Sequence, residues 1–196
     1  MHVIRLATAA DAAELAALYA PFVAAAATSF ELEPPGRGEM ARRIESVCRH
    51  TPWLVWEDAG RLAGYAYASR HRERAAYQWS VDVSAYVDPA WHRRGIGRAL
   101  YAALFRCLER QGFYRAYAGI TLPNSASVGL HSAMGFGIVG VFRAVGYKLG
   151  RWHDVAWYER ALRPLAPNPA PPVPLAGWTP SAIAAVLADE RADPRQ

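Results

Sequence analysis

The chain has 196 residues, 53% of them hydrophobic, and a formal net charge of +5 at pH 7. This length suits one domain with its own core plus an appendage. The chain has only two cysteines, Cys48 and Cys107, which argues against a disulfide framework and a cysteine-rich zinc site. A reducing, cytoplasmic setting is therefore expected. The longest apolar stretch, Leu15 to Phe30, contains Pro21 and is too short to cross a membrane, so a soluble protein is expected.

The first half of the chain alternates strand-like and helix-like segments. His2 to Leu6 predicts a short strand, and Thr8 with Asp11 three residues later has capping-box spacing for a helix to about Ala20. Pro21 is expected to end that helix. The next elements are a helix over Glu39 to Arg49, a hairpin over Trp53 to Tyr67, and a long strand from about Tyr77 to Val87.

The second half continues the same alternation. Apolar positions recur at helical spacing from Ile96, and Gly112 is placed to end that helix. A strand, a helix and two strands are then expected over Tyr114 to Thr121, Asn124 to Met134, Gly137 to Tyr147 and Trp152 to Arg160. The order predicts an α/β fold, with a mixed central sheet of about seven strands flanked by helices on both faces.

The chain changes character after Leu162. Residues 1–162 make up the predicted α/β domain, and residues 163–178 are proline-rich, which is typical of an extended linker. Residues 179–196 form a tail in which a short helix is expected from Thr179 to Glu190, capped by Thr179 and with Pro180 in its first turn.

The segment from His92 to Leu100 has the composition of a phosphate cradle. It follows a strand-like run and opens a helix, and Gly95 and Gly97 let the backbone curl so that N–H groups converge on an anion. It lacks the third glycine of a dinucleotide motif and the Gly-Lys-Ser/Thr ending of a P-loop. On these residues alone, a strand-to-helix turn without any ligand remains an equal alternative.

Several segments together resemble the GNAT acyl-CoA N-acyltransferases. These are the turn from Arg93 to Arg98, the run Asn124-Ser-Ala-Ser, and the run Leu130-His-Ser-Ala-Met-Gly-Phe. Within the family, the sequence is most similar to the phosphinothricin and methionine sulfoximine acetyltransferases, through Ser29-Phe-Glu-Leu-Glu-Pro, Tyr77-Gln-Trp, Tyr86-Val-Asp-Pro and the segment from Val145 to Val155. The resemblance covers residues 4–162 and leaves out the tail.

The resemblance implies acetyl-CoA as cosubstrate, and no metal. Backbone N–H groups would hold the pyrophosphate, and these belong to Arg93, Arg94, Gly95, Ile96, Gly97 and Arg98. Tyr86 and Val87 would bond the pantetheine arm, and Asn124 and Ser127 would contact it from the next helix. Asn124 suits a helix N-cap equally well. His92 stands where the family has Gln or Arg, so no side-chain contact is implied there.

The resemblance also implies candidates for proton transfer. The position of the family's catalytic glutamate, two residues after a Trp-Ser pair, is Asp82 here, and its shorter side chain acts as general base either directly or through a water. A carboxylate at a strand exit without any role is the alternative. His131 stands where this subgroup has a histidine that relays a proton or orients the amine, and a satisfied core histidine is the competing interpretation.

Acceptor recognition is assigned by the same resemblance. Arg72 and Arg74 fall where cationic side chains meet the acidic groups of the acceptor, and Tyr77 and Phe30 where aromatic rings wall the pocket. A solvated loop is the alternative for the arginines. The family assembles as homodimers with the loop that bears Phe30 near the neighbouring subunit, so a homodimer is expected.

The predicted function is transfer of the acetyl group of acetyl-CoA to the amine of a small amino-acid-like acceptor of the phosphinothricin or methionine sulfoximine type. Two alternatives stay open: acetylation of a protein N-terminus or another amine, and a non-catalytic acetyl-CoA-binding module. A nucleic-acid partner is disfavoured because no clustered basic run alternates with aromatic residues. A membrane partner is not expected either.

Overall fold

The computed structural model, which describes residues 2–188, is built on one mixed sheet of seven strands in the order β1-β2-β3-β4-β5-β7-β6. Every neighbouring pair is antiparallel except β4 with β5, which is parallel. The strands are β1 (His2–Leu6), β2 (Trp53–Asp58), β3 (Arg61–Arg70), β4 (Ser80–Val87), β5 (Arg115–Thr121), β6 (Gly137–Lys148) and β7 (Arg151–Ala161). The predicted fold class and order of elements are confirmed.

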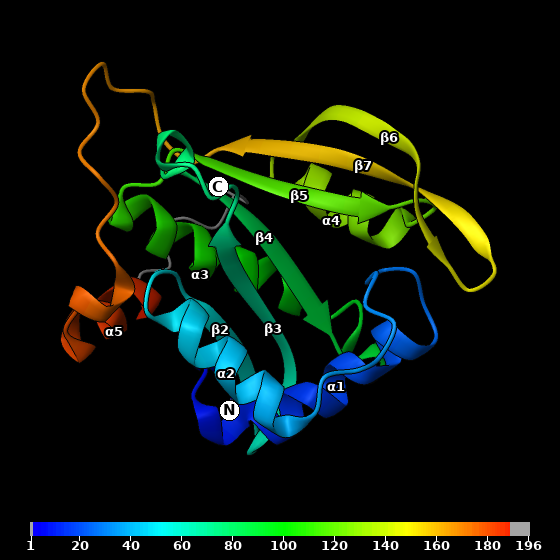
Figure 1. Ribbon diagram of the computed structural model, residues 1–196. Helices are drawn as coiled ribbons and strands as arrows, with labels where there is room; N and C mark the ends of the chain where they lie inside the picture. The colour runs from blue at the N-terminus through cyan, green and yellow to red at the C-terminus, as the bar shows by residue number, and fades with distance from the viewer. Residues whose placement is uncertain (1, 189–196) are drawn as a thin grey trace.

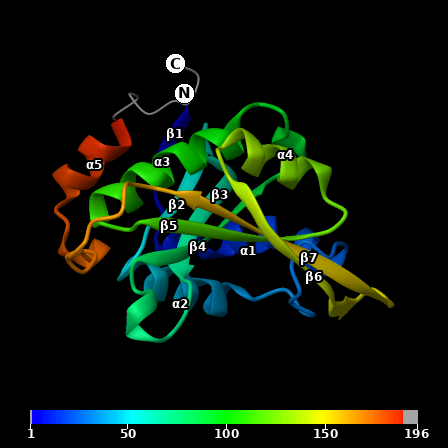
Figure 2. The ribbon, with the colours of Figure 1, turned by 90° about the horizontal axis from the view of Figure 1, so that it is seen from above.

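Helices cover both faces of this sheet. They are α1 (Ala12–Ala24), α2 (Arg37–Cys48), α3 (Ile96–Gln111), α4 (Ser125–Ala133) and α5 (Pro180–Ala188), with short 3-10 turns η1 (Ala9–Asp11), η2 (Ala75–Tyr77), η3 (Pro89–Trp91) and η4 (Leu175–Gly177). Figure 2 shows α3 and α4 on one face and α1 and α2 on the other. Within residues 2–188, no helix has the length and apolar character needed to span a membrane.

Two predicted boundaries are wrong for identifiable reasons. The first helix does not end before Pro21 but continues to Ala24, because its last turn is held by packing: Val23 is fully buried, and the ring of Phe22 lies 5.2 Å from that of Tyr86. A proline costs one helical hydrogen bond, which this burial outweighs. The long strand begins at Ser80 because Tyr77 closes a 3-10 turn through its N–H to the carbonyl of Arg74.

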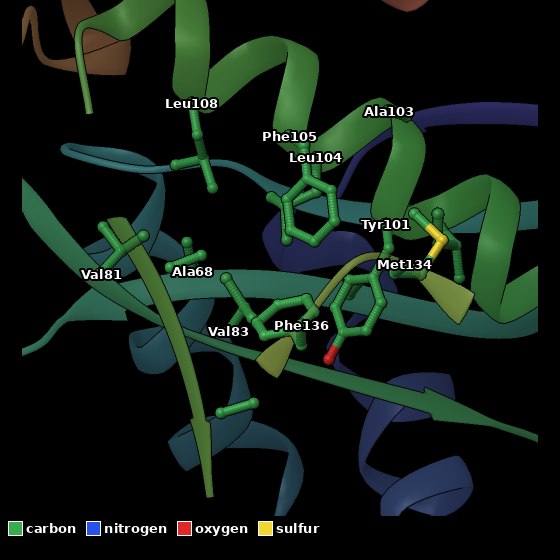
Figure 3. Packing of buried hydrophobic residues seen from close by; sticks show 14 of the residues in the cluster. Ala68, Val81, Val83, Tyr101, Ala103, Leu104, Phe105, Leu108, Met134 and Phe136 are labelled. Carbon is green, nitrogen blue, oxygen red and sulfur yellow. The ribbon is translucent and has the colours of Figure 1, made fainter. Parts of the chain in front are cut away.

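Apolar side chains divide into two cores separated by the sheet. Figure 3 shows side chains of α3, among them Leu104 and Leu108, directed at Ala68, Val81 and Val83 of β3 and β4. The opposite core joins α1 and α2 to the other face of β2 and β3. Because side chains alternate along a strand, the residues between these core positions of β4 face α1 and α2. Asp82 is one of them.

The parallel pairing of β4 and β5 is short. It joins Ser80 to Arg115, Val81 to Ala116 and Asp82 to Tyr117, and no later residue of β4 pairs with β5 in the described chain. Both strands continue: β4 stays paired with β3 as far as Val87, and β5 with β7 as far as Thr121. Figure 1 shows the two strands diverging. An opening in the sheet therefore starts next to Asp82.

Lys148, the only lysine in the chain, ties β6 to the end of α1. Its ammonium donates to the carbonyl oxygens of Val23, Ala26 and Ser29 at 2.7, 2.9 and 2.6 Å, and the residue is only 5% exposed. A charged donor thus satisfies one carbonyl in the last turn of α1 and two just beyond it, where the end of a helix leaves such groups unpaired. The β6–β7 hairpin and the loop after α1 are held together by this one side chain.

The segment after β7 runs along the domain before it reaches α5 (Figure 1). The indole N–H of Trp79 donates to the carbonyl of Ala170 at 2.9 Å, and the side chain of Gln111 donates to the carbonyl of Val173 at 2.8 Å. Helix α5 packs on α3, and the N–H of Ala182 donates to the Thr179 hydroxyl, which confirms that cap. The last two residues of the predicted helix lie outside the described residues.

Replacing Lys148 with methionine tests the tie between β6 and α1. The variant leaves three carbonyls without their shared donor, so we expect the free energy of unfolding to fall by at least about 2 kcal/mol and Tm by roughly 4–8 °C. Thermal unfolding followed by circular dichroism measures the change. Arg143→Met, an exposed position on the same strand, is the control and should change Tm little. Equal losses in the two variants would refute the tie.

Candidate functional site

The loop between β4 and α3 presents an array of backbone donors. Arg93 and Gly95 have positive φ angles of 62° and 80°, and this repeated left-handed turn lets successive N–H groups converge on one side of the loop. Helix α3 follows at once, and the first intrahelical bond is donated by Ala99 to Gly95. The N–H groups before Ala99 therefore have no acceptor within the helix, and the positive end of the helix dipole lies at the same place.

Glycine is required at the start of α3 for a packing reason. A Cβ atom on Gly97 would lie 3.2 Å from the Leu130 side chain of α4 and 3.7 Å from that of Val87, so a larger residue would push α3 away from its neighbours. A Cβ on Gly95 would meet nothing within 4 Å, which leaves that side of the loop open. The two glycines therefore have different roles: Gly97 allows close packing, and Gly95 allows the turn.

Neighbouring side chains hold this loop in shape. The ring Nε2 of His92 donates to the carbonyl of Val87 at 2.9 Å, and the Arg94 guanidinium lies 4.8 Å from the centre of the Trp91 ring. His92 therefore braces the loop. Such a preformed array of N–H groups suits a phosphate or pyrophosphate.

Tyr86 and Val87 form the end of β4 beside the opening. The ring of Tyr86 lies away from it, in edge contact with Tyr19 at 4.9 Å and beside Tyr65 at 5.2 Å. Its side chain therefore belongs to the core on the α1 and α2 side. Only backbone groups of this pair are placed to bond a ligand that enters between β4 and β5.

Asp82 stands at the last paired position of β4 and β5 and is held by a residue that the sequence interpretation did not include. The Nδ1 atom of His71, just after β3, lies 2.6 Å from a carboxylate oxygen of Asp82, and the His71 ring stacks on Tyr117 of β5 at 4.4 Å. Burial raises the pKa of the Asp82 carboxyl, and the hydrogen bond from His71 opposes this rise. A buried carboxylate whose pKa is raised is characteristic of proton-transfer sites.

His131 lies in the core with both ring nitrogens engaged. Its Nδ1–H donates to the carbonyl of Ser127 at 2.8 Å, its Nε2 accepts from the Tyr101 hydroxyl at 3.0 Å, and the residue is 5% exposed. Burial lowers the pKa of the ring, which keeps it neutral. Of the two interpretations that the sequence left open, this arrangement favours the satisfied core histidine.

Helix α4 begins as its sequence predicts. The side-chain oxygen of Asn124 accepts from the N–H of Ser127 at 3.0 Å, which is an N-cap bond. The bond uses the amide oxygen and leaves the amide nitrogen as a donor. A structural role and a binding role for Asn124 are therefore compatible in this geometry.

The predicted acceptor-binding residues fall into two groups. Arg72, Arg74 and Tyr77 are exposed on the loop that follows His71, and the ring of Tyr77 lies 6.1 Å from that of His71. Phe30 lies instead against the β6–β7 hairpin, where its ring fills the space in front of Gly146. Within this chain, the first group lies close to Asp82 through His71. In residues 2–188, no cluster of three His, Cys, Asp or Glu side chains is arranged to hold a metal ion.

Comparison with known proteins gives a consistent result. The profile of the acetyltransferase (GNAT) domain matches residues 4–157. A phosphinothricin N-acetyltransferase of Streptomyces viridochromogenes is 40% identical to this chain over 171 residues, which cover 87% of this chain and 93% of that protein. An L-methionine sulfoximine/L-methionine sulfone acetyltransferase of Salmonella typhimurium is 36% identical over a segment that covers 57% of this chain and 65% of that protein. The crystal structure of a GNAT superfamily phosphinothricin acetyltransferase from Sinorhizobium meliloti in complex with AcCoA superposes with a TM-score of 0.82 at 35% identity, covering 86% of this chain and 93% of that one.

The bond between His71 and Asp82 predicts the behaviour of the carboxyl. Because burial raises the pKa of Asp82 and the His71 hydrogen bond lowers it, His71→Phe, which keeps an aromatic ring beside Tyr117, should raise that pKa further. Titration of the Asp82 carboxyl carbon by NMR measures the shift. His50→Phe, an exposed histidine elsewhere, is the control. An unchanged or lower pKa in the His71 variant would contradict this account.

Proposed function

Because this chain belongs to the GNAT acetyltransferase family and is an acetyl-CoA-dependent N-acetyltransferase, we propose that its acceptor is the amine of a small amino-acid-like compound of the phosphinothricin or methionine sulfoximine type. The named activities of the relatives support this acceptor class. The observation that carries the proposal is the place of Asp82: it is a half-buried carboxylate with a raised pKa at the last residue pair of β4 and β5, beside the opening in the sheet.

We assign the cosubstrate to the opening and the loop beyond it. The N–H groups from Arg93 to Arg98 are placed to hold a pyrophosphate, and the free edge of β4 up to Val87 to bond the pantetheine arm. Asn124 and Ser127 at the start of α4 complete this site. The open face of Gly95 and the close packing at Gly97 fit such a ligand, since no side chain fills the turn. When bound, acetyl-CoA supplies the activated acetyl group.

Asp82 is the general base in this proposal. Its carboxylate takes a proton from the ammonium of the acceptor, directly or through a water, and so frees the nitrogen lone pair that attacks the acetyl carbon. The nitrogen attack forms the C–N bond and a tetrahedral intermediate, which then collapses with cleavage of the C–S bond. The second proton lost by the nitrogen passes to the departing sulfur, so that the products are the amide and the CoA thiol. His71 fixes the orientation of the carboxylate. Donors at the end of β4 are placed to stabilise the negative oxygen of the intermediate state.

We assign the other predicted site residues to acceptor binding or to positioning. Arg72 lies near enough to lower the pKa of Asp82 by its charge, which supports a role for Arg72 in binding the carboxylate of an amino acid whose amine reaches Asp82. We assign the same role to Arg74 on the same loop. Tyr77 adds an aromatic wall beside them. His131 acts as a positioning residue, because its bonds to Tyr101 and Ser127 fix α4 against α3.

We further propose that three segments of the chain have different roles. Residues 1–162 carry catalysis, and residues 163–178 link them to the tail of residues 179–196. The bonds from Trp79 to Ala170 and from Gln111 to Val173 support a role for the linker as a brace, because Trp79 lies directly before β4.

A homodimer is also part of the proposal. The β6–β7 hairpin is the edge of the sheet and exposes an apolar surface in which every residue is at least half exposed: Ile138, Val139, Phe142, Val145, Tyr147, Leu149 and Trp152. Exposed edges and large apolar patches are characteristic of surfaces that pair with another chain. Phe30 lies beside the same hairpin, so a second copy would approach the loop that bears it.

Asp82→Asn tests the chemistry. The amide keeps the size of the side chain but cannot take a proton, so kcat/KM should fall by roughly 10²–10⁴-fold while acetyl-CoA still binds. Release of the CoA thiol with methionine sulfoximine or phosphinothricin as acceptor measures activity. Glu45→Gln, an exposed carboxylate on α2, is the control. A loss below tenfold would reject Asp82 as the base, and a wild-type protein that acetylates neither acceptor would reject the acceptor class.

Light scattering tests the dimer. Wild-type protein should have twice the chain mass of 21.5 kDa, and the double variant Phe142→Glu with Trp152→Glu should have the chain mass, because two charges are introduced into the apolar surface. Leu165→Glu, an equally exposed position in the linker, should remain a dimer. A monomeric wild type at micromolar concentration would overturn this assignment.

A further inference from the structure

His71 is enclosed by aromatic rings from three other parts of the chain. It follows β3 directly, and its ring stacks on that of Tyr117 of β5 with a centroid distance of 4.4 Å and an interplanar angle of 20°. The rings of Tyr77 and Trp157 make T-shaped contacts with the same ring at 6.1 and 6.2 Å. The side chain of His71 is 13% exposed, compared with 30% for Asp82. Such packing limits the orientations that the ring can adopt toward the carboxylate.

The bond between His71 and Asp82 determines which ring nitrogen carries the hydrogen. A carboxylate can only accept, so the contact of 2.6 Å between Nδ1 and a carboxylate oxygen places the hydrogen of the neutral ring on Nδ1. The lone pair is then on Nε2, and none of the hydrogen bonds within residues 2–188 uses that nitrogen. His131 differs, because both of its ring nitrogens are engaged. Of these two histidines, His71 is the one with a basic nitrogen available.

A proton added to this pair is held by the ring. Two titratable groups 2.6 Å apart take up protons as a pair. The ordinary pKa of an imidazole is about 6.5 and that of an aspartate carboxyl about 3.9, so the carboxyl would need a rise of more than about 2 units to compete. Burial raises the pKa of Asp82, but the hydrogen bond and charge of His71 and the charge of Arg72 all oppose that rise. The favoured state after uptake is therefore a carboxylate beside an imidazolium, two groups that also attract each other.

Among the described residues around the pair, only His71 has a side chain that ordinarily titrates near neutral pH. The neighbours whose charge or ring reaches the pair are Tyr67 of β3, Arg115 and Tyr117 of β5, Glu159 of β7, and Arg72 and Tyr77 of the loop after His71. Arginine, tyrosine and glutamate side chains ordinarily titrate outside the range from pH 5 to pH 8. Burial raises the pKa of Tyr67 and Tyr117 further. A change of activity within that range therefore reports on His71.

We propose that Asp82 and His71 act as one base, in which His71 holds the proton taken from the acceptor amine. The inference rests on the proposed function and adds a second residue to its base. The N–H bond of the ammonium breaks and leaves its electron pair on the nitrogen. The proton passes from the second carboxylate oxygen of Asp82 through water to Nε2, so Asp82 ends as a carboxylate and His71 as an imidazolium. Loss of the Nε2 proton to solvent restores the pair for the next turnover.

NMR measures directly where the pair holds its proton. In wild-type protein at high pH, the ring nitrogens of His71 should show the tautomer with its hydrogen on Nδ1. As the pH is lowered, Nε2 should take up a proton before the carboxyl carbon of Asp82 titrates. A carboxyl carbon that titrates at a higher pH than the ring would overturn the proposal. The measurement needs neither an acceptor nor a variant, so it tests the pair independently of activity.

His71→Asn separates a proton-holding role from a positioning role. The Asn side chain keeps an N–H that can donate to Asp82, but it cannot take up a proton. At pH 7, kcat/KM for phosphinothricin or methionine sulfoximine should fall at least tenfold, while the affinity for acetyl-CoA stays unchanged. His50→Asn, which replaces an exposed histidine elsewhere, is the matched control and should leave kcat/KM unchanged. Equal activity in the two variants would mean that His71 only positions the carboxylate.

The pH dependence of kcat gives a second measurement on the same variants. A base has to be unprotonated to act, so wild-type activity should fall as the pH is lowered through the range in which His71 takes up its proton. In His71→Asn the remaining carboxylate is protonated only at lower pH, so this fall should move by at least about one pH unit in the acid direction. The acceptor amine ionises equally with both proteins. An unshifted profile would contradict the proposal.

The outcomes separate this inference from the proposed function. If wild-type protein acetylates the acceptors, Asp82→Asn is inactive and His71→Asn behaves as the wild type, the inference is wrong and the proposed function stands. If wild-type protein acetylates neither acceptor, both are wrong. Unchanged thermal unfolding of His71→Asn shows that its fold is intact, and if that variant unfolds, the NMR titration of wild-type protein decides.

Discussion

The early end of the parallel pairing between β4 and β5 is the constraint on which the site depends. Three pairs hold the strands together, and the last of them places Asp82 beside Tyr117. Beyond it, β4 is held by β3 and β5 by β7, so the opening is kept by the rest of the sheet and not by the ligand. The donors at the start of α3 follow β4 in the chain, after the connection of residues 88–95 that contains η3. One break in pairing therefore positions the proposed base and the anion-binding loop together.

Buried polar groups hold the elements around this opening. Lys148 joins the hairpin to the end of α1, His71 joins β3 to Asp82, and His131 joins α4 to Tyr101 of α3. Each group has found its partners inside the protein, as burial demands. Buried polar groups with internal partners thus hold the elements of this fold in place.

Local patterns in the sequence predicted most elements because they depend on neighbours in the chain. Helical spacing from Ile96, the glycine at 112 with a φ of 100°, and Asn124 as a cap all follow this rule, and all are observed. The sequence predictions are wrong or incomplete where contacts between residues far apart in the chain determine the structure. Packing of Phe22 on Tyr86 carries α1 past Pro21, and the partner of Asp82 comes from another strand. His71 carries no signal in the sequence, because only the register of β3 against β4 brings it there.

By itself, the sequence determined the α/β class, the order of the elements and the family, and it located the glycine turn and Asp82 within motifs. These properties follow from the periodicity of apolar residues, from helix caps and from short sequence motifs. Only the tertiary structure decided that His131 is enclosed by Tyr101 and Ser127, that Phe30 lies on the hairpin, and that His71 bonds Asp82 through one ring nitrogen. The physical reason is that burial and electrostatics depend on which residues contact each other across the sheet. These contacts join residues far apart in the sequence and form only when the chain folds.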